Sequence, residues 1–164
     1  MIKTDDYVDF TSLQSLEAAF HGATKGKRYR TYSAYFNYHR LEVLLDLQDE
    51  LRSSSYSPRP HRHFTVNDPK KRLIDAPHFR DRIVHHAVCA ILKKVYEPCF
   101  IYDSFACRQG KGSHAALRRL QHLVRWQTDK PLYVLHLDIS KYYASVNHDV
   151  LKQLLRKKLS DPLL

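Results

Sequence analysis

The stretch YVLHLDISKYYASVNHDVL, from Tyr133 to Leu151, leads an apolar run into the carboxylate of Asp138. Apolar side chains alternate along the run, which is typical of a strand, and we expect that strand over 132–137. The residues predicted to face a core are Leu135, Leu137 and Ile139. Burying a carboxylate is costly unless it is paired or bound to a metal. Asp138, at the end of the strand, is therefore either part of a metal or phosphate site or an ordinary loop or capping residue.

The chain after Asp138 predicts a turn and then a helix from about His148 to Leu159, capped by Asn147 or Ser145. The expected strand has no obvious sheet partner elsewhere in the sequence. We therefore expect the chain to stop before its last domain is complete.

Upstream of this stretch, helical periodicity dominates. The predicted helices begin near Leu13, with Ser12 or Thr11 as the cap, and then cover 33–52, about 79–96, and a segment that starts after a cap at Ser113. The predicted order is two helices, a hairpin, two helices, one strand and one helix. This order indicates an α+β fold in which helices prevail.

A basic hairpin is predicted at about 61–75, within HRHFTVNDPKKRLIDAP. Its strand candidates are 64–66 and 72–74, and Asn67-Asp68-Pro69-Lys70 has the chemistry of a turn. Lys71 and Arg72 follow the turn. Such cations either neutralise a triphosphate or form a solvated charge cluster at an exposed turn.

A glycine-containing loop is predicted at about 101–113, within FACRQGKGSHAAL. Its glycines would let the backbone approach a phosphate, Arg108 and Lys111 supply positive charge, and a helix follows. The spacing is not that of a Walker loop. The alternative is a simple glycine-rich connection before a capped helix.

Two adjacent histidines occur in DRIVHHAV, at positions 85 and 86. Adjacent residues point in different directions around a helix, so His85 and His86 are a poor metal-binding pair. We expect a structural role or a contact with RNA for them.

The charge balance favours a polyanionic partner. Lys and Arg number 27 against 17 Asp and Glu, which gives a net charge of +10, and the cations recur along the chain, most densely in KGKRYR at 25–30. The three cysteines form no CxxC pair, so neither a disulfide framework nor a zinc site is expected. The polar opening predicts no signal peptide, and no apolar run has the length of a membrane span. A cytoplasmic setting without membrane contact is therefore the expectation.

Three segments, taken in order, resemble the N-terminal half of a bacterial reverse transcriptase. YSPRPHRHFTVNDPKKRLIDAPHFRDRIVHHAV is similar to the first fingers block, IYDSFACRQGKGSHAAL to the block that touches template and primer, and LYVLHLDISKYYASVNHDVL to the palm block with the first catalytic aspartate. The hairpin and loop segments are most similar to the reverse transcriptases of diversity-generating retroelements. Group II intron and retron enzymes are more distant matches.

The resemblance implies roles for the residues of the third block. Asp138 would bind both catalytic metal ions, Mg²⁺ or Mn²⁺, and Ile139 would offer its backbone carbonyl to a metal. Lys141 and Tyr142 would line the triphosphate through backbone amides. Tyr143 matches the aromatic gate that excludes a ribose 2′-hydroxyl, although Tyr142 beside it is an alternative.

The first two blocks are implied to bind nucleotide and nucleic acid. Arg72, with Lys71 beside it, would neutralise the incoming triphosphate. Arg108 and Lys111 of the second block would contact the nucleic acid, and Arg28 and Arg30 of the basic segment KGKRYR are expected to contact it as well.

The implied architecture is a fingers region over 1–130 and the start of a palm domain over 131–164, which would supply the first strand–helix unit of a ferredoxin-like palm. The implied activity is RNA-directed DNA synthesis, with an RNA template, a DNA or RNA primer, deoxynucleotides and a small basic accessory protein as partners. The Y-x-D-D pair of the family is absent from the sequence. We therefore expect this chain alone to be inactive. The alternatives are an RNA-binding fragment without catalysis, or an accessory piece that associates with another polypeptide.

Overall fold

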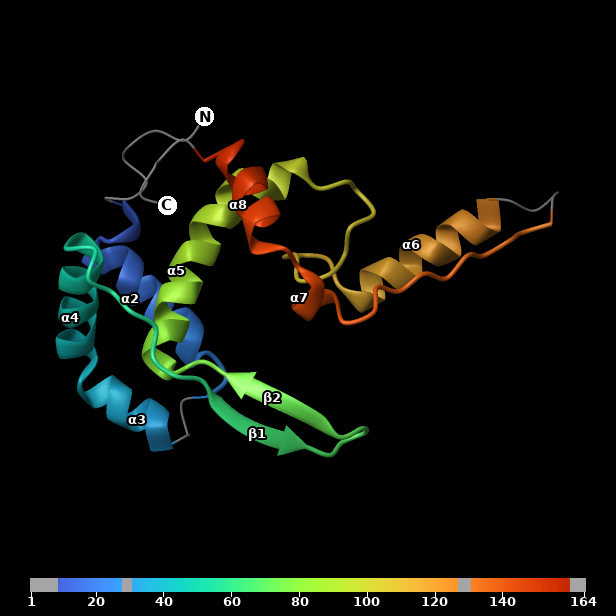
Figure 1. The fold of residues 1–164 in the computed structure, drawn as a ribbon. Coiled ribbons are helices and arrows are strands. Elements are labelled where there is room, and N and C mark those ends of the chain that lie inside the picture. The colour runs from blue at the N-terminus through green and yellow to red at the C-terminus, as the bar shows by residue number, and fades with distance from the viewer. Residues whose placement is uncertain (1–8, 28–30, 127–130, 160–164) are drawn as a thin grey trace. The chain divides into compact units, whose positions relative to one another are not determined.

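The computed structural model describes residues 9–27, 31–126 and 131–159. Its elements are α2 (Leu13–Thr24), α3 (Thr31–Tyr38), α4 (Arg40–Arg52), β1 (Arg62–Val66), β2 (Arg72–Ala76), α5 (Phe79–Tyr96), the 3-10 turn η1 (Glu97–Cys99), α6 (Ser113–Trp126), α7 (Tyr142–Ser145) and α8 (His148–Arg156). The chain forms two compact units, one of Met1–Lys94 with Leu159–Leu164 and one of Val95–Lys158. The fold is helix-rich with one antiparallel pair of strands, in agreement with the α+β expectation (Figure 1).

The first unit has a core built from three helices, α2, α4 and α5 (Figure 1). Each helix contributes the apolar stripe that its periodicity predicts. The fully buried side chains at the centre of the core are Leu16, Phe20, Leu44, Leu47 and Ile83. The rings of Phe20 and Phe79 meet edge to face at 5.7 Å. This packing fixes the start of α5, which directly follows the hairpin in the chain.

The starts of α2 and α4 can be compared with the prediction from the sequence. Ser12 is the cap of α2, because its side chain accepts a hydrogen bond from the Ser15 backbone N–H over 3.2 Å. The single helix expected over 33–52 is wrong in one respect, since it is broken into α3 and α4 at His39. His39 is the cap residue of α4 and has non-helical dihedral angles, without a capping hydrogen bond from its side chain, and its Nδ1 lies 3.0 Å from Oε2 of Glu42.

The predicted hairpin is confirmed, and its strands are longer than expected. Arg62 pairs with Ala76, Phe64 with Ile74 and Val66 with Arg72, in antiparallel register. Because side chains alternate across a strand, these pairs share one face of the hairpin. The pairs His63–Asp75 and Thr65–Leu73 lie on the other face.

The second unit holds α6 and α8 together with the turns between them. Asn147 is the cap of α8, because its side chain accepts hydrogen bonds from the N–H groups of Asp149 (2.9 Å) and Val150 (3.1 Å). The Tyr96 hydroxyl donates to the Leu155 carbonyl over 3.0 Å, near the end of α8. This bond attaches the last helix to the end of α5.

The strand expected over 132–137 is not formed. In the described part of the chain the only sheet is the β1–β2 pair, and residues 131–139 carry no regular structure. Leu135, Leu137 and Ile139 were predicted to face a core, yet all are exposed, Leu135 to 80%. A strand is stable only when its backbone pairs with a neighbour. The structure therefore does not show the strand–helix unit of a ferredoxin-like palm that was expected here.

The division into units falls at Val95 and differs from the expected boundary between fingers and palm at 130. That boundary touches residues 127–130, which lie outside the described residues, so the assignment of fingers and palm stays a prediction. None of the helices in the described ranges is long and apolar enough to span a membrane.

Candidate nucleic-acid interface

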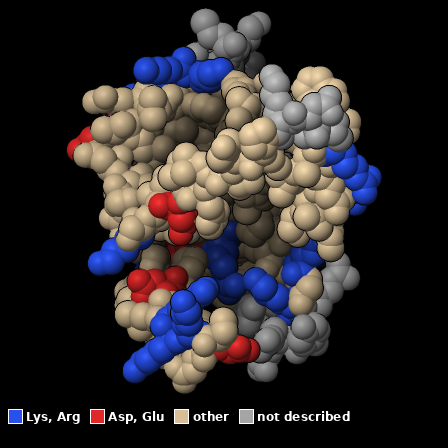
Figure 2. Space-filling view, turned by 90° about the vertical axis from the view of Figure 1, so that its right-hand side faces the viewer, with Lys and Arg blue, Asp and Glu red and all other residues tan. Residues whose placement is uncertain are grey.

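Positively charged side chains lie at several places on the face of the molecule drawn in Figure 2. Figure 2 shows Lys and Arg side chains recurring over one face, with smaller patches of Asp and Glu between them. Which of these cations are available for a ligand depends on their local contacts.

The hairpin presents Lys71 and Arg72 to solvent. Lys71 lies at the end of the turn and Arg72 opens β2, and both residues are exposed. On the opposite face, Nδ1 of His63 lies 2.5 Å from Oδ1 of Asp75, so the one carboxylate of the strands is already paired. Arg72 therefore occupies a face without a competing carboxylate, as a triphosphate ligand would require.

A buried carboxylate, Asp81, fixes the position of the hairpin. Asp81 is 1% exposed and lies in the first turn of α5. Its two oxygens accept hydrogen bonds from the Tyr56 hydroxyl (2.8 Å) and the Arg59 backbone N–H (3.0 Å). Burial, and then the hydrogen bond to Asp81, raise the pKa of Tyr56 well above its ordinary value, so the hydroxyl remains a donor. The segment before β1 is thereby anchored to α5.

The neighbouring Arg80 is also buried, and its guanidinium forms an ion pair with Glu50 of α4. Its charge also lies 5.6 Å from the centre of the Tyr56 ring. This network of Tyr56, Arg80 and Asp81 was not predicted from the sequence. The available signal was the carboxylate of Asp81 in the first turn of an apolar helix, where the helix dipole favours it, with Arg80 directly before it.

His86 packs against Gly22 of α2, and a Cβ built at Gly22 would lie 3.1 Å from its Nδ1. Burial, followed by the charge of Lys27, lowers the pKa of His86. The expectation of a structural role is consistent with this contact. Contact of His85 or His86 with RNA stays a prediction.

The predicted template loop is organised by Arg108. Its Nε donates to Oε1 of Glu97 over 2.7 Å, and its NH1 donates to the carbonyls of Ile101 and Ser104, each over 3.0 Å. The side chain is only 11% exposed. These contacts use the donors of Arg108 to hold the loop together. A direct contact of Arg108 with nucleic acid would require the loop to open.

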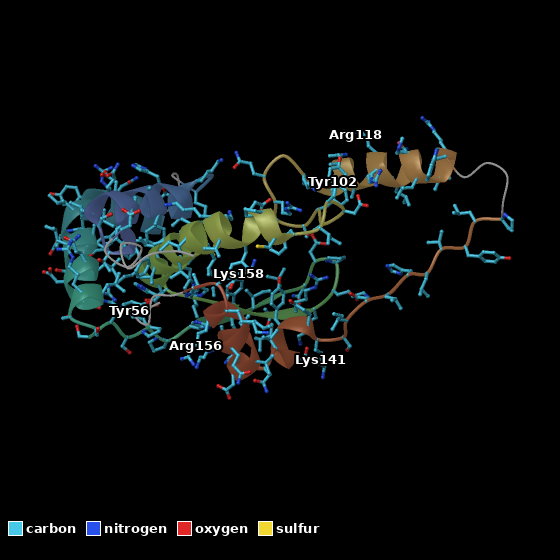
Figure 3. All side chains as sticks on the ribbon, turned by 90° about the horizontal axis from the view of Figure 1, so that it is seen from above. Tyr56, Tyr102, Arg118, Lys141, Arg156 and Lys158 are labelled. Carbon is cyan, nitrogen blue, oxygen red and sulfur yellow. The ribbon has the colours of Figure 1, made fainter. Side chains whose placement is uncertain are left out.

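Lys111 has a similar local environment. Its ammonium donates to the Tyr102 carbonyl and lies 4.4 Å from the centre of the Tyr102 ring. A shallow pocket of about 440 Å³ opens beside it, and Arg118, Arg119 and His122 of α6 contribute to its wall. Figure 3 shows Tyr102 in the loop that precedes α6 and Arg118 on that helix. Lys111 thus belongs to a basic and aromatic surface, although its own donors are partly used.

Arg119 of the same surface is paired with Asp103, with 2.8 Å between Nε and Oδ1. This hydrogen bond lowers the pKa of Asp103 and raises that of Arg119. Arg118 is exposed and has no ion pair among the described residues. Of these two α6 arginines, Arg118 is the one more accessible to a phosphate.

The residues of the third block lie close together in the chain and are exposed. Lys141 adopts the left-handed conformation, with φ 50°, and precedes α7. The rings of Tyr142 and Tyr143 meet edge to face at 5.3 Å, and Tyr143 is 91% exposed. Asp138 is exposed as well. An exposed ring at position 143 is accessible to a sugar, as a gate must be.

The metal expected at Asp138 is not supported by a complete set of ligands. Among the described residues, no group of three His, Cys, Asp or Glu side chains lies close enough to hold a metal ion. Mg²⁺ is bound in proteins by one or two carboxylates together with substrate phosphates and water. Asp138 and the Ile139 carbonyl could supply part of such a set. They do not by themselves fit a two-metal site.

The remaining predicted contacts divide between the two units. Arg28 and Arg30 lie outside the described residues. Lys71 and Arg72 belong to the first unit, whereas Asp138 and the residues 141–143 belong to the second. The roles that the resemblance implies for all of these residues stay predictions.

Comparison with known proteins places this chain near intron-encoded proteins. It is 32% identical over 126 residues to protein YkfC of Escherichia coli K12, covering 74% of this chain and 33% of that protein. It is 27% identical over 161 residues to the group II intron-encoded protein LtrA of Lactococcus lactis subsp. cremoris, covering 94% of this chain and 24% of LtrA. An uncharacterized 91 kDa protein in the cob intron of Schizosaccharomyces pombe is 27% identical over 123 residues, covering 74% of this chain and 15% of that protein.

No protein-family model matches the chain. The chain spans a third or less of the length of each of these curated relatives. The similarity nevertheless runs through most of the chain and is that of a distant homologue.

Proposed function

We propose that this chain, a distant homologue of group II intron-encoded proteins, is part of an RNA-directed DNA polymerase. The observation that carries the proposal is the extent of the match to LtrA, 94% of the chain. A match of that extent includes the hairpin, the glycine-containing loop and the Asp138 segment together. These are the three segments that resemble consecutive blocks of a reverse transcriptase.

The proposed reaction of the full-length protein is attack of the primer 3′-hydroxyl on the α-phosphate of a deoxynucleotide, with release of pyrophosphate. Such catalysis depends mainly on positioning and on neutralisation of charge. Within it, Lys71 and Arg72 would bind the triphosphate from the exposed hairpin. Lys141 and Tyr142 would bind through their backbone amides, and Tyr143 would exclude a 2′-hydroxyl.

Asp138, with the carbonyl of Ile139, would contribute to the binding of Mg²⁺ or Mn²⁺, which in this class of reaction lowers the charge on the phosphates. The described residues provide only part of that ligand set, so no catalytic step is assigned to a metal held by this chain alone. The subgroup of diversity-generating retroelements, and with it a basic accessory protein as partner, rests on the hairpin and loop sequences.

The proposal is tested by primer extension with the protein expressed from its gene together with any coding sequence downstream of codon 164. An RNA template with an annealed DNA primer should be extended in the presence of deoxynucleotides and Mg²⁺. Asp138→Asn should abolish extension while leaving binding of the template–primer intact. Extension by the Asp138→Asn protein at the wild-type rate would overturn the assignment of Asp138.

A second candidate is an RNA-binding piece without catalysis, which the isolated carboxylate of Asp138 favours. This candidate predicts that the purified 164-residue chain binds RNA at low salt and loses affinity steeply as salt rises. It also predicts that the chain incorporates no deoxynucleotide. Metal-dependent incorporation by this chain alone would exclude it, and measurement of the molar mass in solution would show whether the chain associates with itself.

A further inference from the structure

The thiol of Cys99 and the ammonium of Lys158 are in contact within the second unit, although the two residues are 59 positions apart. Lys158 Nζ donates a hydrogen bond to Cys99 Sγ over 2.8 Å, and both side chains are exposed. Cys99 is the last residue of η1, and Lys158 follows the end of α8, where Figure 3 shows it. A sulfur and an amine nitrogen from two distant segments therefore lie side by side, within reach of small solutes.

Two further contacts fix the segments that carry this pair. Cys99 Sγ lies 3.3 Å from the carbonyl oxygen of Val95, to which its thiol donates. The Tyr96 hydroxyl donates to the Leu155 carbonyl over 3.0 Å, so the end of α8 is held on the end of α5 by a bond that involves neither the thiol nor the ammonium. The approach of the two segments therefore does not depend on the contact between Cys99 and Lys158 itself.

The other two cysteines have different surroundings. Cys89 and Cys107 are exposed and free, as Cys99 is, but neither forms a hydrogen bond with a lysine of the described ranges. All three thiols are thus open to the same small oxidants. Only at Cys99 does the described structure place an amine next to the sulfur, where it could capture an oxidised form.

The charges of the pair change together when the sulfur is oxidised. An adjacent lysine is one of the surroundings that favour a thiolate, and the thiolate is the form that a peroxide oxidises. The hydrogen bond with Cys99 raises the pKa of Lys158, so the nitrogen is protonated while the sulfur is reduced. A sulfenic acid carries no negative charge to stabilise the ammonium. The nitrogen therefore becomes a better nucleophile when the sulfur becomes an electrophile.

We propose that Cys99 and Lys158 are a modification site, at which hydrogen peroxide produces a reversible covalent cross-link between Sγ and Nζ. The Cys99 thiolate attacks the peroxide, the O–O bond breaks, and the products are a sulfenic acid and hydroxide. One proton of the Lys158 ammonium neutralises the hydroxide, and the free amine attacks the sulfur. The S–N bond forms, the S–O bond breaks, and the hydroxyl leaves as water with a second proton of the nitrogen.

The product is a sulfenamide, the class of compound that sulfenic acids form with nitrogen. One peroxide is reduced to two waters, and the two side chains together lose two hydrogen atoms. A thiol reverses the link by attack on the sulfur, which releases the amine. The link closes the segment 99–158, which holds the loop of Arg108 and the segment of Asp138. It is independent of the proposed function, since it requires neither nucleic acid nor metal.

The test is mass spectrometry of the full 164-residue chain after treatment with hydrogen peroxide and digestion without a reductant. The expected product is a Cys99 peptide joined to a Lys158 peptide, lighter than their sum by two hydrogen atoms and separated again by dithiothreitol. Lys158→Arg should abolish the link and leave a sulfenic acid at Cys99 that dimedone traps. Peroxide should also slow amide hydrogen exchange in α8 on the order of tenfold in the wild-type chain, and not in Lys158→Arg.

The matched control is Lys157→Arg, which changes the exposed lysine directly before Lys158. Its link should form as in the wild-type chain, as should that of Cys89→Ser, and circular dichroism shows whether each variant is folded. The proposal is overturned if Cys99 is oxidised without a link to Lys158, if Lys157 is joined to Cys99 to the same extent, or if the linked peptides retain the oxygen atom. None of these outcomes depends on polymerisation, so failure of this site and failure of the proposed activity are distinguishable.

Discussion

The Tyr56 hydroxyl donates a hydrogen bond of 2.8 Å to the buried carboxylate of Asp81. The two residues are 25 positions apart, and the hairpin lies between them in the chain. Their bond, with that from the Arg59 backbone to the same carboxylate, closes the loop that carries the hairpin. The orientation of the hairpin, and of Lys71 and Arg72 on it, relative to α5 therefore depends on Asp81, which is assigned no ligand in the proposed function.

Replacement of Asp81 should destabilise the first unit. In Asp81→Asn one carboxylate oxygen becomes an NH2 group, which cannot accept a hydrogen bond, so either the Tyr56 hydroxyl or the Arg59 N–H loses its acceptor. Loss of a buried charge-assisted hydrogen bond costs about 2 kcal/mol, and we expect a loss of that size in the free energy of unfolding, measured by urea denaturation. Asp75→Asn is the control, because Asp75 is paired on the exposed hairpin and should change stability by less than about 1 kcal/mol. Equal losses in the two variants would contradict the structural role of Asp81.

Stability should fall as the pH is lowered from about 7 to about 5, around the ordinary histidine pKa. The pKa values of His78 and His86 are depressed in the folded chain, in both cases first by burial and then by nearby cations. The unfolded chain therefore binds more protons than the folded chain in this range, and the free energy of unfolding rises with pH. The contribution of the two histidines is present above the unfolded pKa and is lost as the pH falls through the folded pKa.

The measurement is urea denaturation at several pH values, with the double variant His78→Gln/His86→Gln as the comparison. The variant should show a flatter dependence between pH 5 and 7, whatever its absolute stability. A slope as steep as that of the wild type would show that other groups are responsible.

Much of the first unit could be predicted from its sequence, because local periodicity and core packing agree there. Most of the apolar stripes of α2, α4 and α5 are buried, although Leu41 and Leu45 of α4 are exposed, and the turn residues 67–70 lie between two paired strands. The break at His39 was not predictable from the apolar pattern, which continues through it. The structure shows His39 with non-helical dihedral angles and no capping hydrogen bond from its side chain, so no local sequence signal accounts for the break.

The candidate site was less predictable, for two physical reasons. Burial of Asp81 depends on contacts with Tyr56 and Arg59, and no local pattern reports such a contact. The alternation around Asp138 predicted a strand that is not formed, because a strand also needs a partner for its backbone. Arg108 of the glycine-containing loop shows a similar limit. An arginine in such a loop suggested a phosphate ligand, whereas its hydrogen bonds are to Glu97, Ile101 and Ser104.

Arg108 should be required for the order of the loop between η1 and α6. Its guanidinium bridges Glu97, Ile101 and Ser104, and a lysine cannot reproduce this planar set of donors. We expect Arg108→Ala and Arg108→Lys each to accelerate amide hydrogen exchange in residues 100–112 by roughly tenfold, the equivalent of about one lost hydrogen bond. Arg125→Ala, at the exposed end of α6, should leave that exchange unchanged. Wild-type exchange in the lysine variant would show that charge alone holds the loop.

Tyr143 should control the choice between deoxynucleotides and ribonucleotides in the proposed polymerase. Its ring is almost fully exposed and adjoins that of Tyr142, so it can stand beside the sugar of a bound nucleotide without burial of its hydroxyl. Tyr143→Ala should raise incorporation of ribonucleotides relative to deoxynucleotides on the order of tenfold, because the space for a 2′-hydroxyl is no longer filled. Tyr143→Phe keeps the ring and should discriminate as the wild type does. Primer extension with each nucleotide type measures the ratio. If Tyr142→Ala changes the ratio and Tyr143→Ala does not, the gate is the first of the two tyrosines, because the pair is consecutive and either ring could fill that space.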